Sequence, residues 1–384
     1  MRGPKVIVVG GGTMGSATAW ALAARGAEVT VLERFSHVHE YGSHSGYTRI
    51  IRESYHEGAG YVPLVRRADA LWRALGEKAG ETLLVRTGMV EFGPEDDPDY
   101  QGAIAACVSA GVEHELMDAA AARRRFPIAV PAGWTACFTP SGGYLRVGPC
   151  LEALKREAMS LGAAWRTGAR VREVALGERP RVLLDDGALL PADQVVVTAG
   201  AYLPGLLPGF MPGKLKVLRR VLAWTRPDPA EIDRLAAMPV WASFGPAGFV
   251  YGFPYGHEGV TGFKLACHVP PPEVGAAEAG VDPERVDRAI HPADLAPLAA
   301  FLAEYLPAGR GEFVHATVCL YTCTPSTDFV IDHVPGDRRA WVAGGFSGHG
   351  FKFAPAIGEL VADAVLTGAA PEALRAFARA RHAG

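Results

Sequence analysis

Four basic side chains stand where a solvated charge is unusual. Lys352 lies between two phenylalanines, Lys264 lies between a phenylalanine and a leucine, and Arg49 and Arg52 belong to a segment rich in Gly, Ser and His, residues 42–52. An Arg binds a carboxylate through two parallel hydrogen bonds and a Lys acts as a point charge, so such a pair could orient a carboxylate ligand. Taken alone, the two arginines are more simply explained as surface or phosphate-facing residues, and strand alternation could place Lys264 outside.

A glycine-rich turn near the N-terminus has the pattern of a dinucleotide site. Gly10, Gly12 and Gly15 form G-x-G-x-x-G directly after the apolar residues 5–9. In order, these glycines allow a tight turn, let the backbone approach a pyrophosphate, and permit close helix–strand packing. Glu33 ends the next predicted strand, where it could bind ribose hydroxyls; an acid there argues against NADP but does not separate NAD from FAD. The alternative is a glycine-rich turn in an ordinary α/β fold.

The same N-terminal stretch also resembles a signal peptide, because Arg2 and Lys5 precede the uncharged residues 6–24. Its glycines would disrupt the apolar helix of such a peptide, and a nucleotide-binding turn explains them better. We therefore expect a cytoplasmic protein. No other stretch approaches the ~20 apolar residues of a membrane span.

The composition sets limits on the function. The chain has 384 residues, 49% of them hydrophobic, which suits two domains with large cores. A net charge of −3 without a long basic run argues against nucleic acid as a partner. The six cysteines are typical of reduced cytosolic thiols. Cys319 and Cys323 make a poor metal pair, because no second pair stands at ligand spacing, and we expect no metal.

Two kinds of element alternate along the chain. Periodicity predicts helices at residues 13–25, 61–76, 146–161 and 354–366. It predicts strands at residues 5–9, 29–32, 83–92, 170–176, 181–190, 194–198, 217–224, 249–253, 260–266 and 340–343, with a turn signal at Asp186–Gly187. Residues 270–280, rich in Pro and Gly, are a candidate loop or lid. Both ends and the middle carry α/β signals, which suggests a nucleotide domain built from separate segments around a β-rich domain.

Three further segments distinguish FAD from NAD. They are GSHSGYTRIIR at residues 42–52, CLYT at residues 319–322 and GGFSGHGFKF at residues 344–353. Together with the glycine-rich turn they closely resemble the monomeric sarcosine oxidase and N-methyltryptophan oxidase family over essentially the whole chain. The resemblance implies a glycine-oxidase-like α/β fold with an FAD-binding Rossmann-like domain (residues 1–80, 145–215 and 318–384) and an antiparallel β-sheet substrate domain (residues 81–144 and 216–317).

The resemblance also implies a role for individual residues. Cys319 matches the cysteine joined to the flavin 8α carbon by a thioether, and Lys264 matches the lysine that promotes reaction with oxygen. Substrate contacts would come from Arg52, Lys352 and Tyr321, and the active site would also contain Arg49, Tyr251 and His268. Contacts with FAD would come from Gly10, Gly12, Thr13, Met14, Gly15, Glu33, Arg34, Ser43, His44, Thr48, Arg49, Val171, Gly200, Cys319, Gly345, Phe346, Gly348, Gly350 and Lys352.

The activity that the resemblance implies is oxidation of an N-methyl or other secondary amino acid by FAD and oxygen, with imine hydrolysis and release of hydrogen peroxide, by a monomeric enzyme. Two departures shift the expected substrate. Ser45 replaces a second histidine usual in the family, and residues 255–261 form a longer loop than in sarcosine oxidases. Alternatives are therefore a cyclic or bulky amine such as pipecolate, proline or N-methyltryptophan, a dehydrogenase with another electron acceptor, and a non-catalytic flavin-binding module.

Overall fold

A six-stranded, mainly parallel sheet forms the nucleotide-binding part of the molecule. The computed structural model describes residues 3–275 and 278–382. The strand order is β19 (Val330–Val334), β20 (Asp337–Gly344), β13 (Gln194–Val197), β1 (Lys5–Val9), β2 (Glu28–Leu32) and β9 (Ala164–Arg166), and only β19 runs antiparallel to its neighbour. Because β-branched residues fill these strands, the sheet is buried on both faces, as parallel sheets usually are. The predicted strands at residues 5–9, 29–32, 194–198 and 340–343 are confirmed.

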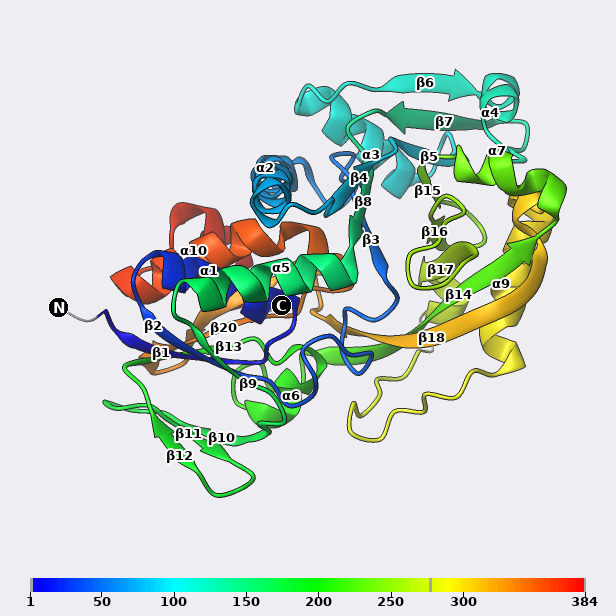
Figure 1. Cartoon of the computed structure of the whole chain (residues 1–384). Coiled ribbons are helices and arrows are strands. Elements are labelled where there is room, and N and C mark those ends of the chain that lie inside the picture. The colour runs from blue at the N-terminus through cyan, green and yellow to red at the C-terminus, as the bar shows by residue number, and fades with distance from the viewer. Residues whose placement is uncertain (1–2, 276–277, 383–384) are drawn as a thin grey trace.

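Helices cover one face of this sheet, and a small sheet lies on the other (Figure 1). The helices are α1 (Thr13–Ala24), α2 (Val62–Ala79), α5 (Val147–Ser160) and α10 (Ala354–Thr367), which confirms all four predicted helices. The packing of α1 on α10 is close: a Cβ at Gly358 would lie 2.6 Å from the backbone of Ala17. The small sheet contains β10 (Val171–Ala175), β11 (Arg181–Leu184) and β12 (Leu189–Pro191).

A second, eight-stranded sheet forms the other half of the molecule. Its order is β18 (Gly311–Cys323), β14 (Lys216–Pro227), β17 (Phe263–Val269), β16 (Phe249–Gly252), β15 (Val240–Ser243), β5 (Met89–Pro94), β7 (Trp134–Thr139) and β6 (Glu115–Asp118). All neighbours are antiparallel except β5 and β15. The long strands β14 and β18 run side by side from the nucleotide-binding half across this sheet (Figure 1).

Two predicted strands are wrong in extent. Residues 83–92 divide at Gly88, whose φ of 74° turns the chain. The first part is β4 (Leu84–Arg86), in a small sheet with β3 (Thr48–Ile51) and β8 (Gly143–Arg146), and the second part is β5. Residues 181–190 divide into β11 and β12, because the Asp186–Gly187 turn joins these two strands rather than β10 and β11.

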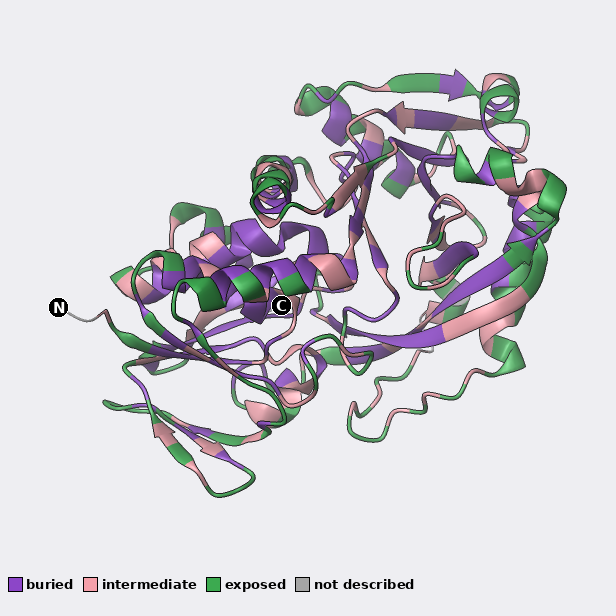
Figure 2. Ribbon diagram, viewed as in Figure 1, coloured by how far each residue is buried: buried purple, intermediate pink, exposed green. Residues whose placement is uncertain are grey.

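Short helices complete the connections: α3 (Pro98–Ser109), α4 (Ala119–Arg125), α6 (Leu203–Leu206), α7 (Ile232–Ala236), α8 (Pro272–Gly275) and α9 (Pro292–Tyr305). The predicted loop at residues 270–280 contains α8, and its residues 276–277 lie outside the described residues. Buried residues concentrate between the helices and the two sheets (Figure 2). In the described part of the chain no single helix has the length and apolar character of a membrane span; only the bent pair Phe351–Thr367 and Glu372–His382 passes together, by length and composition alone.

Candidate functional site

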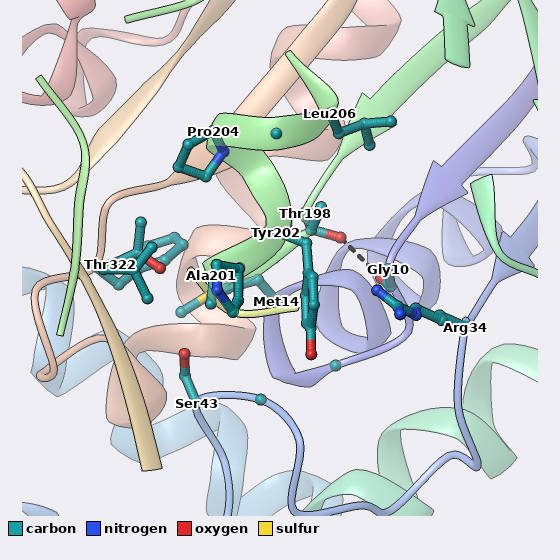
Figure 3. Close-up of a pocket in the computed structure, with 18 of the residues that line it drawn as sticks. Gly10, Met14, Arg34, Ser43, Thr198, Ala201, Tyr202, Pro204, Leu206 and Thr322 are labelled. Carbon is teal, nitrogen blue, oxygen red and sulfur yellow. Dashed lines mark hydrogen bonds between the residues drawn. The ribbon is translucent and has the colours of Figure 1, made fainter. Parts of the chain in front are cut away.

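A cavity of about 920 Å³ opens at the carboxyl ends of the parallel strands β1, β2 and β13 (Figure 3). Open α/β sheets bind their ligands at this edge. The wall includes these residues predicted to contact FAD: Gly10, Gly12, Thr13, Met14, Glu33, Arg34, Ser43, His44, Arg49, Val171, Gly200, Gly345, Phe346, Gly348 and Gly350. The other predicted residues, Gly15, Thr48, Tyr251, Lys264, His268, Arg52, Cys319, Tyr321 and Lys352, are not among the described residues that line it.

The glycine-rich turn has the close approaches that its sequence predicts. Gly10 has a φ of 99°, in the left-handed region that favours glycine, and a Cβ at Gly15 would lie 1.8 Å from the carbonyl oxygen of Gly10. A Cβ at Gly12, by contrast, would meet nothing nearer than His44 at 3.6 Å, so the backbone here faces open space. Helix α1 begins at Thr13 without a side-chain cap or an acidic residue in its first turn. Its free N–H groups and positive dipole end therefore suit a phosphate.

Glu33 is held as a charged acceptor on the cavity wall. Its Oε2 accepts a hydrogen bond from the backbone N–H of Gly11 at 2.7 Å, and its Oε1 accepts one from Phe35 at 2.9 Å. Burial favours the neutral acid, but the hydrogen bonds of His39 and of the Phe35 N–H outweigh burial and lower the pKa of Glu33. Each oxygen keeps a second lone pair, so the carboxylate can still accept from ribose hydroxyls.

Two buried polar atoms on the wall lack a partner. His44 Nε2 and Thr322 Oγ1 are buried and make no hydrogen bond within the described chain, although both residues line the cavity. Buried polar groups are nearly always hydrogen-bonded, so these two atoms fit a polar ligand in the cavity. With the phosphate-binding turn and Glu33, the donor set fits FAD, which the residues above would hold.

Arg49, on β3, connects the cavity to the basic residues behind it. Its Nη1 donates to the carbonyl of Thr48 at 2.8 Å, and its Nη2 donates to those of Ser43 at 3.1 Å and Ser45 at 2.5 Å. The same Nη2 lies 3.6 Å from the Sγ atom of Cys319. This guanidinium contributes to lowering the pKa of both Lys264 and Lys352, so all three cations surround one end of the cavity.

Lys264 projects inward from β17 and is 3% exposed, so it does not lie on the outer face. Its Nζ donates to the carbonyls of Gly46 and Thr48 and to the hydroxyl of Thr48 at 2.9 Å. The ammonium also lies 4.4 Å from the ring centre of Phe253. Burial, followed by the charge of Arg49, lowers the pKa of Lys264 well below its ordinary value. Thr48 thus reaches the site through Lys264.

Lys352 begins a buried hydrogen-bonded chain. Its Nζ donates to the carbonyl of His349 at 2.9 Å and lies 3.5 Å from the hydroxyl of Tyr55. Burial lowers the pKa of His349 to about 4, and its Nε2 faces the carbonyl of Thr327 at 3.0 Å, so the neutral ring donates there and accepts from Tyr55 on Nδ1 at 2.5 Å. Burial, then the charge of Arg52, lowers the pKa of Lys352 to about 7.

Arg52 is buried, at 4% exposure, but it is not an unpaired cation. Its Nη2 donates to Glu57 Oε2 at 3.1 Å and lies 3.0 Å from His56 Nδ1, and its Nη1 is 3.6 Å from Glu91 Oε1. Burial favours the neutral form of Glu57, but Arg52 and His56 lower its pKa below the ordinary range. The surface-arginine alternative is wrong for Arg52, and the two carboxylates beside it were not foreseen.

Aromatic side chains border the basic group. The Nδ1 of His268 lies 3.1 Å from the hydroxyl of Tyr321, and the two rings are 5.2 Å apart. Tyr251 is 6.3 Å from His268, ring centre to ring centre. Burial lowers the pKa of His268 and raises those of Tyr251 and Tyr321, so all three are neutral near pH 7.

Cys319 and Tyr321 point to the same face of β18, as predicted, and join one apolar cluster. The thiol is 1% exposed, and its nearest polar neighbour is Arg49. Ser45 donates to the carbonyl of Val318 at 3.0 Å, so the residue that departs from the family pattern lies directly beside this strand.

Several wall residues were missed by the sequence reasoning. Thr198 donates to the carbonyl of Gly10 at 2.8 Å (Figure 3), and its position at the end of a predicted parallel strand could have indicated it. Arg34 makes a bidentate ion pair with Glu284, at 2.6 and 2.7 Å, and lies 4.9 Å from the Tyr202 ring centre. No local pattern marks Glu284 or Tyr202. Among the described residues, no cluster of three His, Cys, Asp or Glu could hold a metal ion.

Comparison with known proteins agrees with this geometry. A family model described as FAD dependent oxidoreductase matches residues 5–364. The chain is 33% identical over 371 residues to monomeric sarcosine oxidase of Bacillus sp. (strain B-0618), covering 94% of this chain and 92% of that protein. It is 30% identical over 378 residues, 98% of each chain, to N-methyl-L-tryptophan oxidase of Yersinia pestis (strain Pestoides F).

Solved structures give the same fold. NikD, an unusual amino acid oxidase essential for nikkomycin biosynthesis, superposes with a TM-score of 0.83 at 26% identity, covering 98% of each chain. L-proline dehydrogenase from P. horikoshii superposes with a TM-score of 0.80 at 22% identity, covering 97% of this chain and 95% of that one, and is similar in fold alone. The fold and the cavity therefore define an FAD-dependent oxidoreductase. Within that class, the chain belongs to the monomeric sarcosine oxidase and N-methyltryptophan oxidase family of flavin-dependent amine oxidases, as its sequence motifs predict.

Proposed function

We propose that this enzyme oxidises a small secondary or N-methylated amino acid and that Arg52 and Lys352 bind the substrate carboxylate. The observation that supports the proposal is the group of cations, Arg49, Arg52, Lys264 and Lys352, at one end of the cofactor cavity. Bound FAD would accept a hydride equivalent from the carbon next to the amine nitrogen and pass the electrons to oxygen. The imine product would then hydrolyse in water.

The protein's own residues would position the substrate and adjust its charge. A carboxylate held at Arg52 and Lys352 would fix the amine beside the ring plane, while the surrounding cations lower the pKa of the amine and favour its reactive neutral form. Lys264 would stabilise the negative charge that develops on reaction with oxygen. Neutral His268 and Tyr251 would border the substrate without acting as charged groups.

Within this proposal, Cys319 is the flavin attachment site. The support is its matching motif and its contact with Arg49, a residue of the cavity wall. We also propose the predicted division into an FAD-binding and a substrate domain, although β18 crosses the boundary between residues 317 and 318. The name of the Bacillus relative supports a monomer. A cytoplasmic location completes the proposal and rests on the sequence features alone.

The decisive experiment is peroxide production by the purified holoenzyme on a panel of amines: sarcosine, proline, pipecolate, N-methyltryptophan and the corresponding primary amino acids. Turnover of secondary amines far above primary ones is expected. A preference for N-methyltryptophan or a cyclic amine would favour the second candidate, which Ser45 and the 30% identity to N-methyl-L-tryptophan oxidase support. Reduction by an amine followed by only slow reoxidation in air would contradict the oxidase assignment, and no reduction by any member would contradict the proposal as a whole.

A further inference from the structure

Glu91 is a buried carboxylate that the proposed reaction does not use. It lies on β5, its residue is 0% exposed, and neither of its oxygens has a hydrogen-bond partner in the described chain. A buried charge without hydrogen bonds is costly, so it is retained only where something compensates it. The nearest cation is Arg52, whose Nη1 lies 3.6 Å from Glu91 Oε1.

Arg52 therefore lies between two carboxylates that differ in how firmly they are held. Glu91 belongs to a strand paired on both sides, opposite Cys137 of β7 and Ala242 of β15. Glu57 lies in an irregular turn that ends at Gly58, whose φ is 135°. A new carboxylate at Arg52 can displace a side chain on such a turn more easily than one inside a sheet. Glu91 thus stays beside the guanidinium in both situations.

We propose that Glu91 is a positioning residue that determines specificity: its fixed carboxylate orients Arg52 and weakens the binding of the substrate carboxylate to that guanidinium. This inference rests on the proposed function, because it requires Arg52 to bind a carboxylate. An ionised Glu91 attracts Arg52 and repels an incoming carboxylate, so the substrate is oriented without being bound too tightly. Uniformly tight ground-state binding does not speed the chemical step.

The surroundings of Glu91 allow its charge to be observed. Burial raises its pKa to about 6, and Arg52 opposes that rise. The polar groups that face it are Arg52, Ser54 and Glu57 from the loop after β3, Tyr100 from α3 and Cys137 from β7. The Tyr100 and Cys137 pKa values are raised by burial and by contact between the two cysteines 107 and 137, and that of Glu57 is lowered, so none titrates near pH 6. His56 has a pKa lowered to about 3 by burial, and Lys352 titrates near 7.

The test is the binding of acetate to the holoenzyme, measured by calorimetry between about pH 5.5 and 8.5, where these carboxylates and amines change charge. In the wild type, acetate binding should strengthen as the pH falls through about 6, because Glu91 loses its charge. Glu91→Gln should lack this step, keep the step near pH 7 from Lys352, and bind acetate on the order of tenfold more tightly at pH 7.5. With the amine substrate, both KM and kcat should fall, since Arg52 binds more tightly but is less well oriented.

Matched controls separate the possible causes. Glu157→Gln removes a buried carboxylate that pairs with Lys78 and should leave the acetate profile unchanged. Glu91→Asp withdraws the charge by one methylene and should give a smaller step, which serves if Glu91→Gln does not fold. Identical acetate profiles in the wild type and Glu91→Gln, or a wild-type profile without a step near pH 6, would overturn this inference. Acetamide bound as tightly as acetate would instead refute the carboxylate site of the proposed function.

Discussion

Replacing Lys352 with methionine removes a buried charge and keeps most of the side-chain volume. Burial, together with Arg52, lowers the pKa of Lys352 from 10.5 to about 7. Each pKa unit is about 1.4 kcal/mol, so the folded protein disfavours the protonated lysine by roughly 5 kcal/mol relative to the unfolded chain. Between about pH 7 and 10.5 the unfolded chain holds a proton that the folded protein lacks, so the free energy of unfolding rises with pH across that window. Below pH 7 the full cost is present.

The stability of Lys352→Met should therefore gain least on the wild type at high pH. The advantage of the variant in unfolding free energy should shrink by about 3 kcal/mol between about pH 7 and 9.5, measured by urea unfolding of both holoenzymes. Other titrating groups cancel in this difference. The same variant should lose about 10- to 100-fold in kcat/KM for an amino acid, because a hydrogen bond to a charged group is worth about 1.5–3 kcal/mol. A stability difference independent of pH would refute the assignment of a buried, nearly neutral lysine, and unchanged kcat/KM would refute its contact with the carboxylate.

Three other substitutions test separate parts of the site. Cys319→Ser should release its flavin on acid precipitation, whereas the wild type keeps it; quantitative release from the wild type would exclude the tether. Lys264→Met should slow reoxidation of the reduced enzyme by oxygen about 100-fold or more in stopped-flow measurements and change anaerobic reduction by the amine far less, since a fixed charge beside a developing anion is worth about 3 kcal/mol; equal losses in both steps would contradict its role with oxygen. Gly15→Ala places a Cβ 1.8 Å from Gly10 O and should lower the flavin-to-protein absorbance ratio, whereas Gly148→Ala, with nothing within 4 Å, should not; full flavin content in Gly15→Ala would contradict the helix–strand contact.

Local sequence carried most of the cofactor-binding half. The turn at Gly10, Gly12 and Gly15 follows from which residues tolerate a left-handed φ and a close backbone contact, and these requirements are local. The four predicted helices have the predicted positions because their apolar faces repeat with the helical period. The strand break at Gly88 was missed because alternation continues across it, and only the two different sheets on either side reveal it.

The partners of the functional charges were decided by the tertiary structure. Arg52 and Lys352 could be named from their motifs, but the pairing of Arg52 with Glu57 and Glu91 depends on how the loop after β3 packs against β5. The lowered pKa of Lys264 likewise requires β17, β3 and Arg49 to meet in one water-excluded place. Sequence determines which groups can carry charge and which backbone turns are allowed. Which charges face one another, and how far water is excluded from them, is a property of strands that pair from distant parts of the chain, because Coulomb energies depend on separation in space and on the local dielectric.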